Sequence, residues 1–297
     1  MHYPSRSTVI EAVPLTAEAF APFGDVTENP RPDVHPSSAD KHLPLPLAAI
    51  VANQGSAIKY QHVSRQINLY DQAPSGRPGS AVMNVFVCAA RAHIPDPPQT
   101  PAPASAPTQN PAVAEQQQPA SPHPQPSTFP ITVLERHPYT TQTFIPLTAD
   151  PAAHYLVIVA PSLPPGKKKK DDDDLNNGPP QDTLPVPTRL PPATEYPRPL
   201  PGRGMPDLRR VRAFVASAAQ AVTYGAGTWH APMVALGEKG TAVDFVVVQF
   251  ANGVGVEDCQ EVGLRGEGAL DKGGLLVVLK SGERSGGGGR GEGRAKL

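Results

Sequence analysis

The sequence predicts an all-β protein, an antiparallel β-sandwich or β-barrel with one or two short helices. The foldable segments are mainly short, Val-rich runs bounded by Gly, Pro or Asp, which is typical of strands. Of the 39 Pro residues, 12 lie in 95–130 and 13 in 161–206, two segments with few large apolar side chains. We therefore expect one domain over 1–280, interrupted by these two segments as disordered insertions, and a disordered Gly-rich tail at 281–297.

The individual elements follow from local patterns along the chain. A helix is expected over Leu15–Gly24, because Thr16 can cap its N-terminus while Pro22 and Gly24 end it. The turn-like pair Pro138-Tyr139 separates two strands in the middle of the chain. The strands are predicted at Ser80–Ala90, Phe129–His137, Thr141–Leu147, His154–Ala160, Thr241–Phe250 and Gly274–Lys280.

Composition and charge exclude several classes of function. The net charge of −1 predicts no nucleic-acid partner, and no apolar run approaches the 18 residues that would span a membrane. With two cysteines, Cys88 and Cys259, and no secretory signal, we expect an intracellular protein without disulfides. The run KKKKDDDD at Lys167–Asp174 is interpreted as a solvated linker. The final Ala-Lys-Leu is similar to the peroxisomal Ser-Lys-Leu signal, so the expected location is cytoplasmic, or peroxisomal if this ending is read.

Polar side chains that could do chemistry occur in four groups within the foldable segments. The groups are Asn53, Lys59 and Tyr60; Glu135, His137 and Gln142; Tyr224, Trp229 and His230; and Asp244, followed by Gln249 and Asn252.

A metal site is one interpretation of these groups. The spacing Glu135-x-His137 places both side chains on one face of a strand, and His230 could supply a third ligand. The chain has no His-x-His motif, and Glu135 and His137 could equally form a hydrogen-bonded pair. The residues therefore leave the presence of a divalent metal open.

Acid–base chemistry on a small anionic substrate is the other interpretation. The chain has no Gly-x-Ser-x-Gly nucleophile motif and no Gly-rich phosphate loop framed by a strand and a helix. Lys59 beside Tyr60 can bind a carboxylate, and Glu135, His137 and His230 can transfer protons. Trp229 can supply an apolar wall.

Five segments, in order, resemble the ureidoglycolate lyases (ureidoglycolate hydrolases) of allantoin degradation, in their fungal form. They are VIEAVPLTAEAFAPFGDV, ANQGSAIKY, ITVLERHPYTTQTFIPL, VRAFVASAAQAVTYGAGTWHAPMVAL and VDFVVVQFANGVGVEDCQEV. The resemblance implies a cupin-like β-barrel, usually a homodimer, that splits ureidoglycolate into glyoxylate and urea in purine catabolism. This chemistry requires no organic cofactor.

The resemblance also implies roles for the polar residues. Glu135 and His230 would be the base and the acid, in an order that the sequence leaves open. Lys59 would bind the substrate carboxylate with Tyr60 or Asn53. The remaining expectations are Gln142 on the ureido carbonyl, Tyr224 and Trp229 against the substrate, and His137 and Asp244 orienting their neighbours.

Some features depart from the family pattern. The two Pro-rich insertions and the tail are not family features, and the position of Arg91 leaves its role open. Two other functions remain as alternatives. One is a metal-dependent cupin dioxygenase or isomerase with Glu135, His137 and His230 as ligands, and the other is a non-catalytic cupin module that binds partners.

Overall fold

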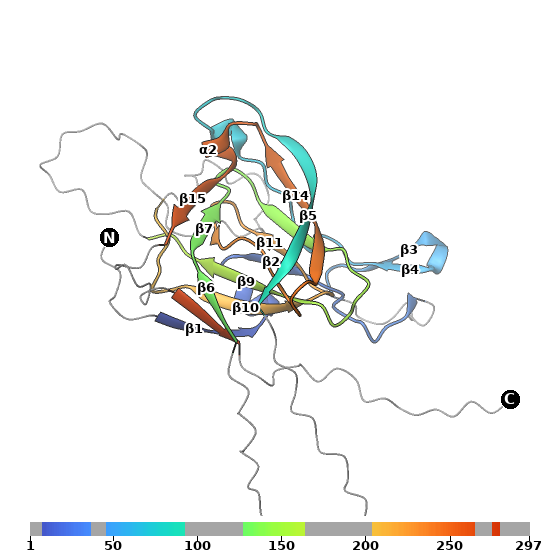
Figure 1. The fold of residues 1–297 in the computed structure, drawn as a ribbon. Coiled ribbons are helices and arrows are strands. Elements are labelled where there is room, and N and C mark those ends of the chain that lie inside the picture. The colour runs from blue at the N-terminus through green and yellow to red at the C-terminus, as the bar shows by residue number, and fades with distance from the viewer. Residues whose placement is uncertain (1–7, 37–45, 93–126, 164–203, 265–274, 280–297) are drawn as a thin grey trace, which may run out of the picture.

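The computed structural model describes residues 8–36, 46–92, 127–163, 204–264 and 275–279 (Figure 1). Within these residues the regular secondary structure is mainly β-strand, with two four-residue α-helices, as the sequence predicted. The predicted tail, the Ala-Lys-Leu ending, the KKKKDDDD run and most of both insertions lie outside the described residues. No helix in the described part of the chain is long and apolar enough to cross a membrane.

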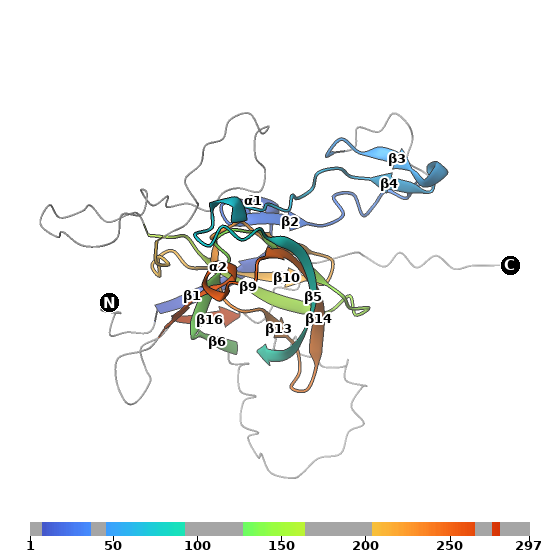
Figure 2. The ribbon, with the colours of Figure 1, turned by 90° about the horizontal axis from the view of Figure 1, so that it is seen from above.

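One sheet of fourteen strands forms the body of the molecule and curves around its interior (Figures 1 and 2). Its main path is β2-β11-β8-β14-β5-β13-β9-β10-β1-β16-β6, and β12 and β7 branch from β9 to reach β15. Most pairs are antiparallel, but β1 runs parallel to β10 and β16, and β13 runs parallel to β5. The sheet is therefore mixed, where the sequence predicted an antiparallel one. The described strands are β1 (Thr8–Pro14), β2 (Gly24–Thr27), β3 (Ile50–Ala52), β4 (Ala57–Lys59), β5 (Ser80–Ala92), β6 (Ser127–Ile131), β7 (Val133–Arg136), β8 (Gln142–Pro146), β9 (His154–Ala160), β10 (Arg212–Ser217), β11 (Ala221–Tyr224), β12 (Trp229–His230), β13 (Val234–Leu236), β14 (Ala242–Ala251), β15 (Gln260–Gly263) and β16 (Leu275–Leu279).

Strand β9 separates two hydrophobic cores. Its sequence HYLVIVA lacks polar alternation, which is typical of a strand buried on both faces. Leu156 and Ile158 belong to one core with Leu134 and Trp229, and the alternate residues of β9 belong to the other. The second core is rich in aromatic side chains and borders the polar cluster described below.

Helix α1 (Ala17–Phe20) anchors the N-terminal segment to the second core. The hydroxyl of Thr16 accepts a hydrogen bond from the amide of Ala19, as expected for an N-cap. The helix is shorter than the predicted Leu15–Gly24. Phe20 is fully buried, and its ring centroid lies 6.1 Å from that of Tyr224. The short helix therefore packs against a residue of the candidate site.

The ends of the predicted insertions are part of the fold. Ser162 and Pro206 form an isolated β-bridge, which brings the two ends of the second insertion together. Strand β6 already begins at Ser127, inside the predicted range 95–130. Its Pro130 is tolerated because β6 lies at the end of the sheet.

Strands β3 and β4 form a separate hairpin, here called the arm, that projects from the body (Figure 2). Its turn, η2 (Asn53–Gly55), has positive φ angles of 48° at Asn53 and 57° at Gln54. Ile50 and Val51 on the arm are 47% and 51% exposed. The chain has a second short 3₁₀-helix, η3 (Tyr70–Gln72). This helix and the α-helix α2 (Gly255–Asp258) lie near the C-terminal end of β14.

Candidate active site

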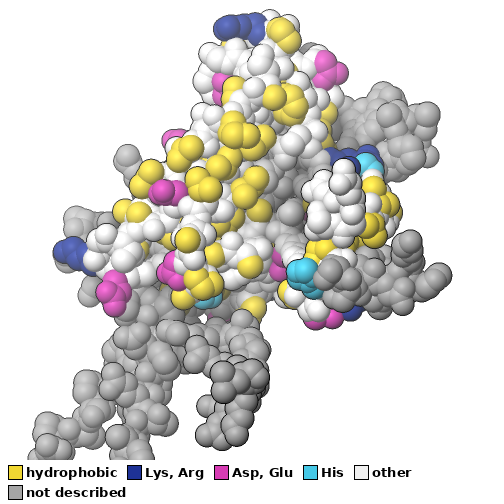
Figure 3. All heavy atoms as spheres, turned by 90° about the vertical axis from the view of Figure 1, so that its right-hand side faces the viewer, with side chains coloured by type: hydrophobic (Ala, Val, Ile, Leu, Met, Phe, Trp, Pro, Cys, Tyr) yellow, Lys and Arg dark blue, Asp and Glu magenta, His cyan; other side chains and the backbone are white. Residues whose placement is uncertain are grey.

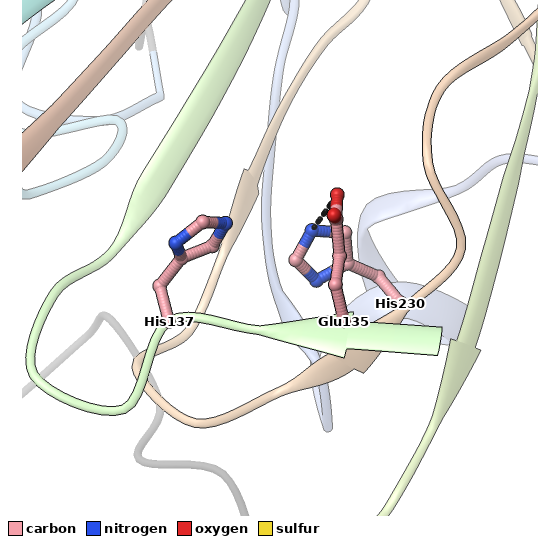
Figure 4. A group of neighbouring side chains, drawn as sticks. All are labelled: Glu135, His137 and His230. Atoms are coloured by element: carbon pink, nitrogen blue, oxygen red, sulfur yellow. Dashed lines mark ion pairs between the residues drawn. The ribbon is translucent and has the colours of Figure 1, made fainter. Parts of the chain in front are cut away.

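A histidine–carboxylate cluster is formed where β7 pairs with β12. In this pairing, His230 lies directly opposite Glu135. Glu135 and His137 project from one side of the β7 segment (Figure 4), whereas the Arg136 guanidinium packs over the Trp229 ring at 4.5 Å. The alternation in the sequence therefore gave the correct faces.

The cluster, Glu135, His137 and His230, is compact and largely buried. Oε1 of Glu135 lies 3.4 Å from Nε2 of His230, and the two imidazole centroids are 5.5 Å apart. The side chain of His230 is 1% exposed and that of Glu135 is 20% exposed. Of these two groups, the carboxylate is therefore the more accessible to solvent. One ligating atom from each of the three residues lies within 4.8 Å of the others.

Backbone carbonyls define the tautomers of both histidines. Nδ1 of His137 lies 2.6 Å from the carbonyl oxygen of Asp258, and Nδ1 of His230 lies 3.1 Å from that of Thr228. Because a carbonyl only accepts, each Nδ1 carries the proton and donates it. A neutral ring then has a lone pair on Nε2, and both Nε2 atoms are buried without a hydrogen-bond partner in the described part of the chain. The 3.4 Å contact between His230 and Glu135 is close enough for an ion pair but lacks hydrogen-bond geometry.

The protonation of the cluster follows from burial and from its own charges. Burial raises the pKa of Glu135, but the contact with His230 outweighs burial and leaves this pKa below its ordinary value. Burial and the nearby His230 lower the pKa of His137 to about 4. At neutral pH the cluster therefore contains an ionised carboxylate and a neutral His137.

Tyr224 and Gln142 extend the cluster along the interior. The ring of Tyr224 stacks on His230 at a centroid distance of 4.0 Å and an interplanar angle of 10°. Gln142 lies opposite Tyr224 in the β8–β11 pair, and its Nε2 donates to Oε1 of Gln249 at 2.7 Å. Burial raises the pKa of Tyr224, so its phenol stays neutral.

The cluster has the donor set of a divalent-metal site. Two free imidazole nitrogens and a carboxylate are ligands of such ions, and metal-binding histidines usually donate their other ring N–H to a carbonyl, as both do here. Glu135, His137 and His230 could therefore hold a metal that acts as a Lewis acid. Cys259 and Glu261 lie on the other side of Glu135, but burial raises the pKa of Cys259 to about 11, which disfavours the thiolate.

Other residues predicted for the site lie elsewhere within the chain. Lys59 and Asn53 are exposed on the arm. Tyr60 follows Lys59, and its hydroxyl is buried with no hydrogen-bond partner among the residues that the structure describes. Trp229 belongs to the opposite core, where its Nε1 donates to the carbonyl of Gly204. Asp244 lies on the face of β14 that points away from the second core, because the alternate residues fill that core.

The predicted site residues separate in space because neighbouring residues of a strand point to opposite faces. Polar residues that are close in the sequence therefore need not be close in the fold. Arg91, whose role was open, packs its guanidinium over the ring of Phe129 at 4.9 Å. The two carbonyls that orient the histidines, those of Thr228 and Asp258, carry no signal in the sequence, because every residue has a carbonyl.

The buried state of His137 predicts a pH dependence of stability. Its pKa is lowered on folding, so below pH about 6.5 the unfolded chain binds a proton that the folded chain does not bind until pH about 4. Stability from this residue is therefore present above pH 6.5 and lost as the pH falls towards 4. In urea unfolding at pH 7.5 and pH 5, His137→Gln should lose less stability on acidification than the wild type. His154→Gln, at the start of β9, should behave like the wild type, and equal acid sensitivity of all three proteins would contradict the prediction.

These features define the class of the protein: an all-β, cupin-like fold with a buried histidine–carboxylate centre. The model of the ureidoglycolate lyase family matches residues 7–270. The chain belongs to the ureidoglycolate lyase family, as the sequence segments indicated.

Proteins named ureidoglycolate lyase resemble this chain over most of its length. The one from Schizosaccharomyces pombe is 34% identical over 253 residues, which are 84% of this chain and 89% of that protein. The one from Saccharomyces cerevisiae is 29% identical over 240 residues, 80% of this chain and 84% of that protein. A bacterial protein, from Burkholderia mallei, is 28% identical over 237 residues, 79% and 78% of the two chains.

Proposed function

We propose that this chain is a lyase that cleaves ureidoglycolate to glyoxylate and urea by proton transfer. The observation that carries the proposal is the buried contact between Glu135 and His230, within a chain of the ureidoglycolate lyase family. The test is to incubate the purified protein with racemic ureidoglycolate and to trap glyoxylate enzymatically. Glyoxylate must form well above the spontaneous rate, and formation at only that rate would refute the proposal.

The reaction moves one proton from oxygen to nitrogen. The substrate carbon bears a hydroxyl, a ureido nitrogen and a carboxylate. As the hydroxyl loses its proton, its C–O bond becomes a carbonyl, the C–N bond breaks and its electron pair goes to nitrogen. The same proton can then be delivered to that nitrogen, so that urea leaves as a neutral molecule. The reaction therefore balances with no oxidant and no added water.

Glu135 and His230 are suited to this transfer as a pair. The ionised carboxylate of Glu135 can accept the hydroxyl proton, and Nε2 of His230 lies 3.4 Å away, where it can share that proton. The Tyr224 ring stacks on the imidazole of His230 and fixes its plane, and the Thr228 carbonyl keeps Nδ1 protonated. His137, neutral and facing the same space, completes the polar wall.

A metal-dependent reaction is a second candidate, favoured by two Nε2 atoms that lie beside a carboxylate and have no hydrogen-bond partner among the described residues. The purified protein should be analysed for bound metal and assayed after treatment with a chelator. Stoichiometric metal, with activity lost on chelation and restored by one ion, would support this candidate. Activity that persists in protein freed of metal would exclude it.

Lys59 is proposed to bind the substrate carboxylate. Its ammonium group is exposed on the arm and has no ion pair among the described residues, so it is available to an anion. Lys59→Ala should raise KM about tenfold or more with little change in kcat, because the contact is made equally in the ground state and the transition state. Lys239→Ala, another exposed lysine, is the control, and an unchanged KM for Lys59→Ala would remove Lys59 from the site.

Mixed oligomers can show which chain receives Lys59. If the arm serves a neighbouring chain, a mixture of Lys59→Ala and His230→Ala subunits would contain some intact sites and regain activity. If the arm serves its own chain, the mixture would not exceed the sum of the two variants.

We further propose that the chain forms a homodimer through the outer face of β5 and β14. Met83, Val85 and Val87 on β5 are 70%, 64% and 71% exposed, and hydrophobic side chains form a band across this face (Figure 3). The arm, with exposed Ile50 and Val51, projects on the same side of the molecule (Figures 1 and 2). A second copy fits this surface, because a two-fold pair would bury the apolar face and bring each arm to the partner.

Val85→Lys should convert the dimer to a monomer, because it would place two ammonium groups in one apolar interface. Light scattering coupled to size-exclusion chromatography measures the mass. Val256→Lys, at a similarly exposed position on α2 (71%), should leave the mass unchanged. A wild type that is monomeric, or a Val85→Lys variant that remains dimeric, would contradict the proposed interface.

A further inference from the structure

A pair of glutamine side chains connects two strands beside the histidine–carboxylate cluster. Gln142 on β8 and Gln249 on β14 are direct partners in the antiparallel register. Nε2 of Gln142 donates a hydrogen bond of 2.7 Å to Oε1 of Gln249. Gln142 is only 4% exposed, so its amide cannot readily replace this hydrogen bond with one to water.

This bond determines which atom of Gln142 remains free. Gln249 engages one of the two Nε2 hydrogens, whereas Oε1 is buried with no hydrogen-bond partner at all among the described residues. Buried polar atoms are almost always paired, and those that are not are often completed by a ligand or by water. Gln142 therefore presents an unpaired acceptor in the interior.

The acceptor is linked to the proposed proton-transfer pair through Tyr224. Gln142 is opposite Tyr224 in the β8–β11 register, and Tyr224 stacks on His230. A single aromatic side chain thus connects the position of Gln142 with that of His230. A substrate that reaches Glu135 and His230 with its hydroxyl would carry its ureido group along this interior wall.

We propose that Gln249 is a positioning residue that holds Gln142 with its oxygen towards the substrate, so that the subsite accepts N–H groups. This inference rests on the proposed ureidoglycolate cleavage and refines it. The ureido group offers N–H donors and a carbonyl acceptor, and the free Oε1 of Gln142 selects the donors. The sequence-based expectation was the opposite one, a Gln142 amide that donates to the ureido carbonyl.

The consequence is selectivity for substrates with a free N–H at this position. A 2-hydroxy acid that carries an ether or an alkyl group in place of the ureido nitrogen would leave the acceptor unpaired on binding. Such a molecule should therefore be a poor competitive inhibitor, whereas an analogue that retains the terminal –NH₂ should compete well.

Three substitutions at Gln249 test the direction of the hydrogen bond. Gln249→Glu can only accept when ionised, so it should hold Gln142 in the same orientation and retain a KM close to that of the wild type. Gln249→Met offers no strong acceptor and should raise KM about tenfold with a smaller effect on kcat. Gln249→Lys, which can only donate, would turn Gln142 the other way and should raise KM at least as much.

The outcomes separate this inference from the proposed function. Wild-type protein without lyase activity would remove the proposed function. Active wild type with Gln249→Met at the same KM, or with Gln249→Glu as impaired as Gln249→Met, would overturn only the role of Gln249. Thermal unfolding of each variant shows whether it is folded, and Gln72→Met, a glutamine in the η3 turn, is the matched control that should have wild-type kinetics.

Discussion

Replacing His230 with alanine is expected to lower kcat for ureidoglycolate cleavage a hundredfold or more. The reason is that Nε2 of His230 lies 3.4 Å from the carboxylate of Glu135, and a well-placed acid–base group contributes about 10²–10⁴-fold to a rate. Glyoxylate trapping under saturating substrate measures kcat directly. His154→Ala, on β9, is the matched control and should keep the wild-type rate.

Loss of folding must be separated from loss of catalysis in this variant. His230 is 1% exposed and stacks on Tyr224, so an alanine leaves a cavity that lowers stability. His230→Gln fills more of that volume but cannot carry a proton in the same way. It should unfold closer to the wild-type temperature and still lose the hundredfold. A folded His230→Gln with a near wild-type rate would remove His230 from proton transfer.

Replacing Glu135 with glutamine is the second large effect, with an expected loss of a hundredfold or more in kcat. The substitution preserves size but removes the negative charge that the lowered pKa of Glu135 keeps in place at neutral pH. The amide can neither accept the hydroxyl proton nor stabilise a protonated His230. We therefore expect kcat and kcat/KM to fall together.

Glu261→Gln provides a demanding control for this prediction. Glu261 lies opposite Glu135 in the β7–β15 pair and has the same charge, but it is exposed. If the loss in Glu135→Gln came only from a change in the local field, Glu261→Gln would lose a comparable share of activity. A wild-type rate for Glu261→Gln beside an inactive Glu135→Gln would assign the effect to the Glu135 carboxylate itself.

The stronger strands could be predicted from the sequence because their signals are local. The segment His154–Ala160 is β9 with the predicted bounds, and β14 and β16 lie within one residue of theirs at each end. The shorter strands β10 to β13 were not predicted. Four of their fifteen residues are Ala, which is depleted in strands, and β12 has only two residues, so they are held by their partners more than by their own propensity.

The pairing of Glu135 with His230 shows where local reasoning stops. That Glu135 and His137 share a face followed from their spacing, since side chains alternate in a strand. His230 follows Glu135 by 95 positions in the sequence. It lies opposite Glu135 because of the register in which β12 pairs with β7. The same holds for the parallel neighbours of β1, because a strand sequence does not encode the direction of its partner.

The residues alone were enough for the fold class, the family resemblance and the shared face of Glu135 and His137. Those conclusions rest on composition, alternation and motif, which are local properties of the chain. The tertiary structure decided which polar groups meet: it joins Glu135, His137 and His230 to Tyr224 and Gln142, and it leaves Lys59 on a projecting arm. It also set the tautomers and the free Gln142 oxygen, because those depend on hydrogen bonds between segments far apart in sequence.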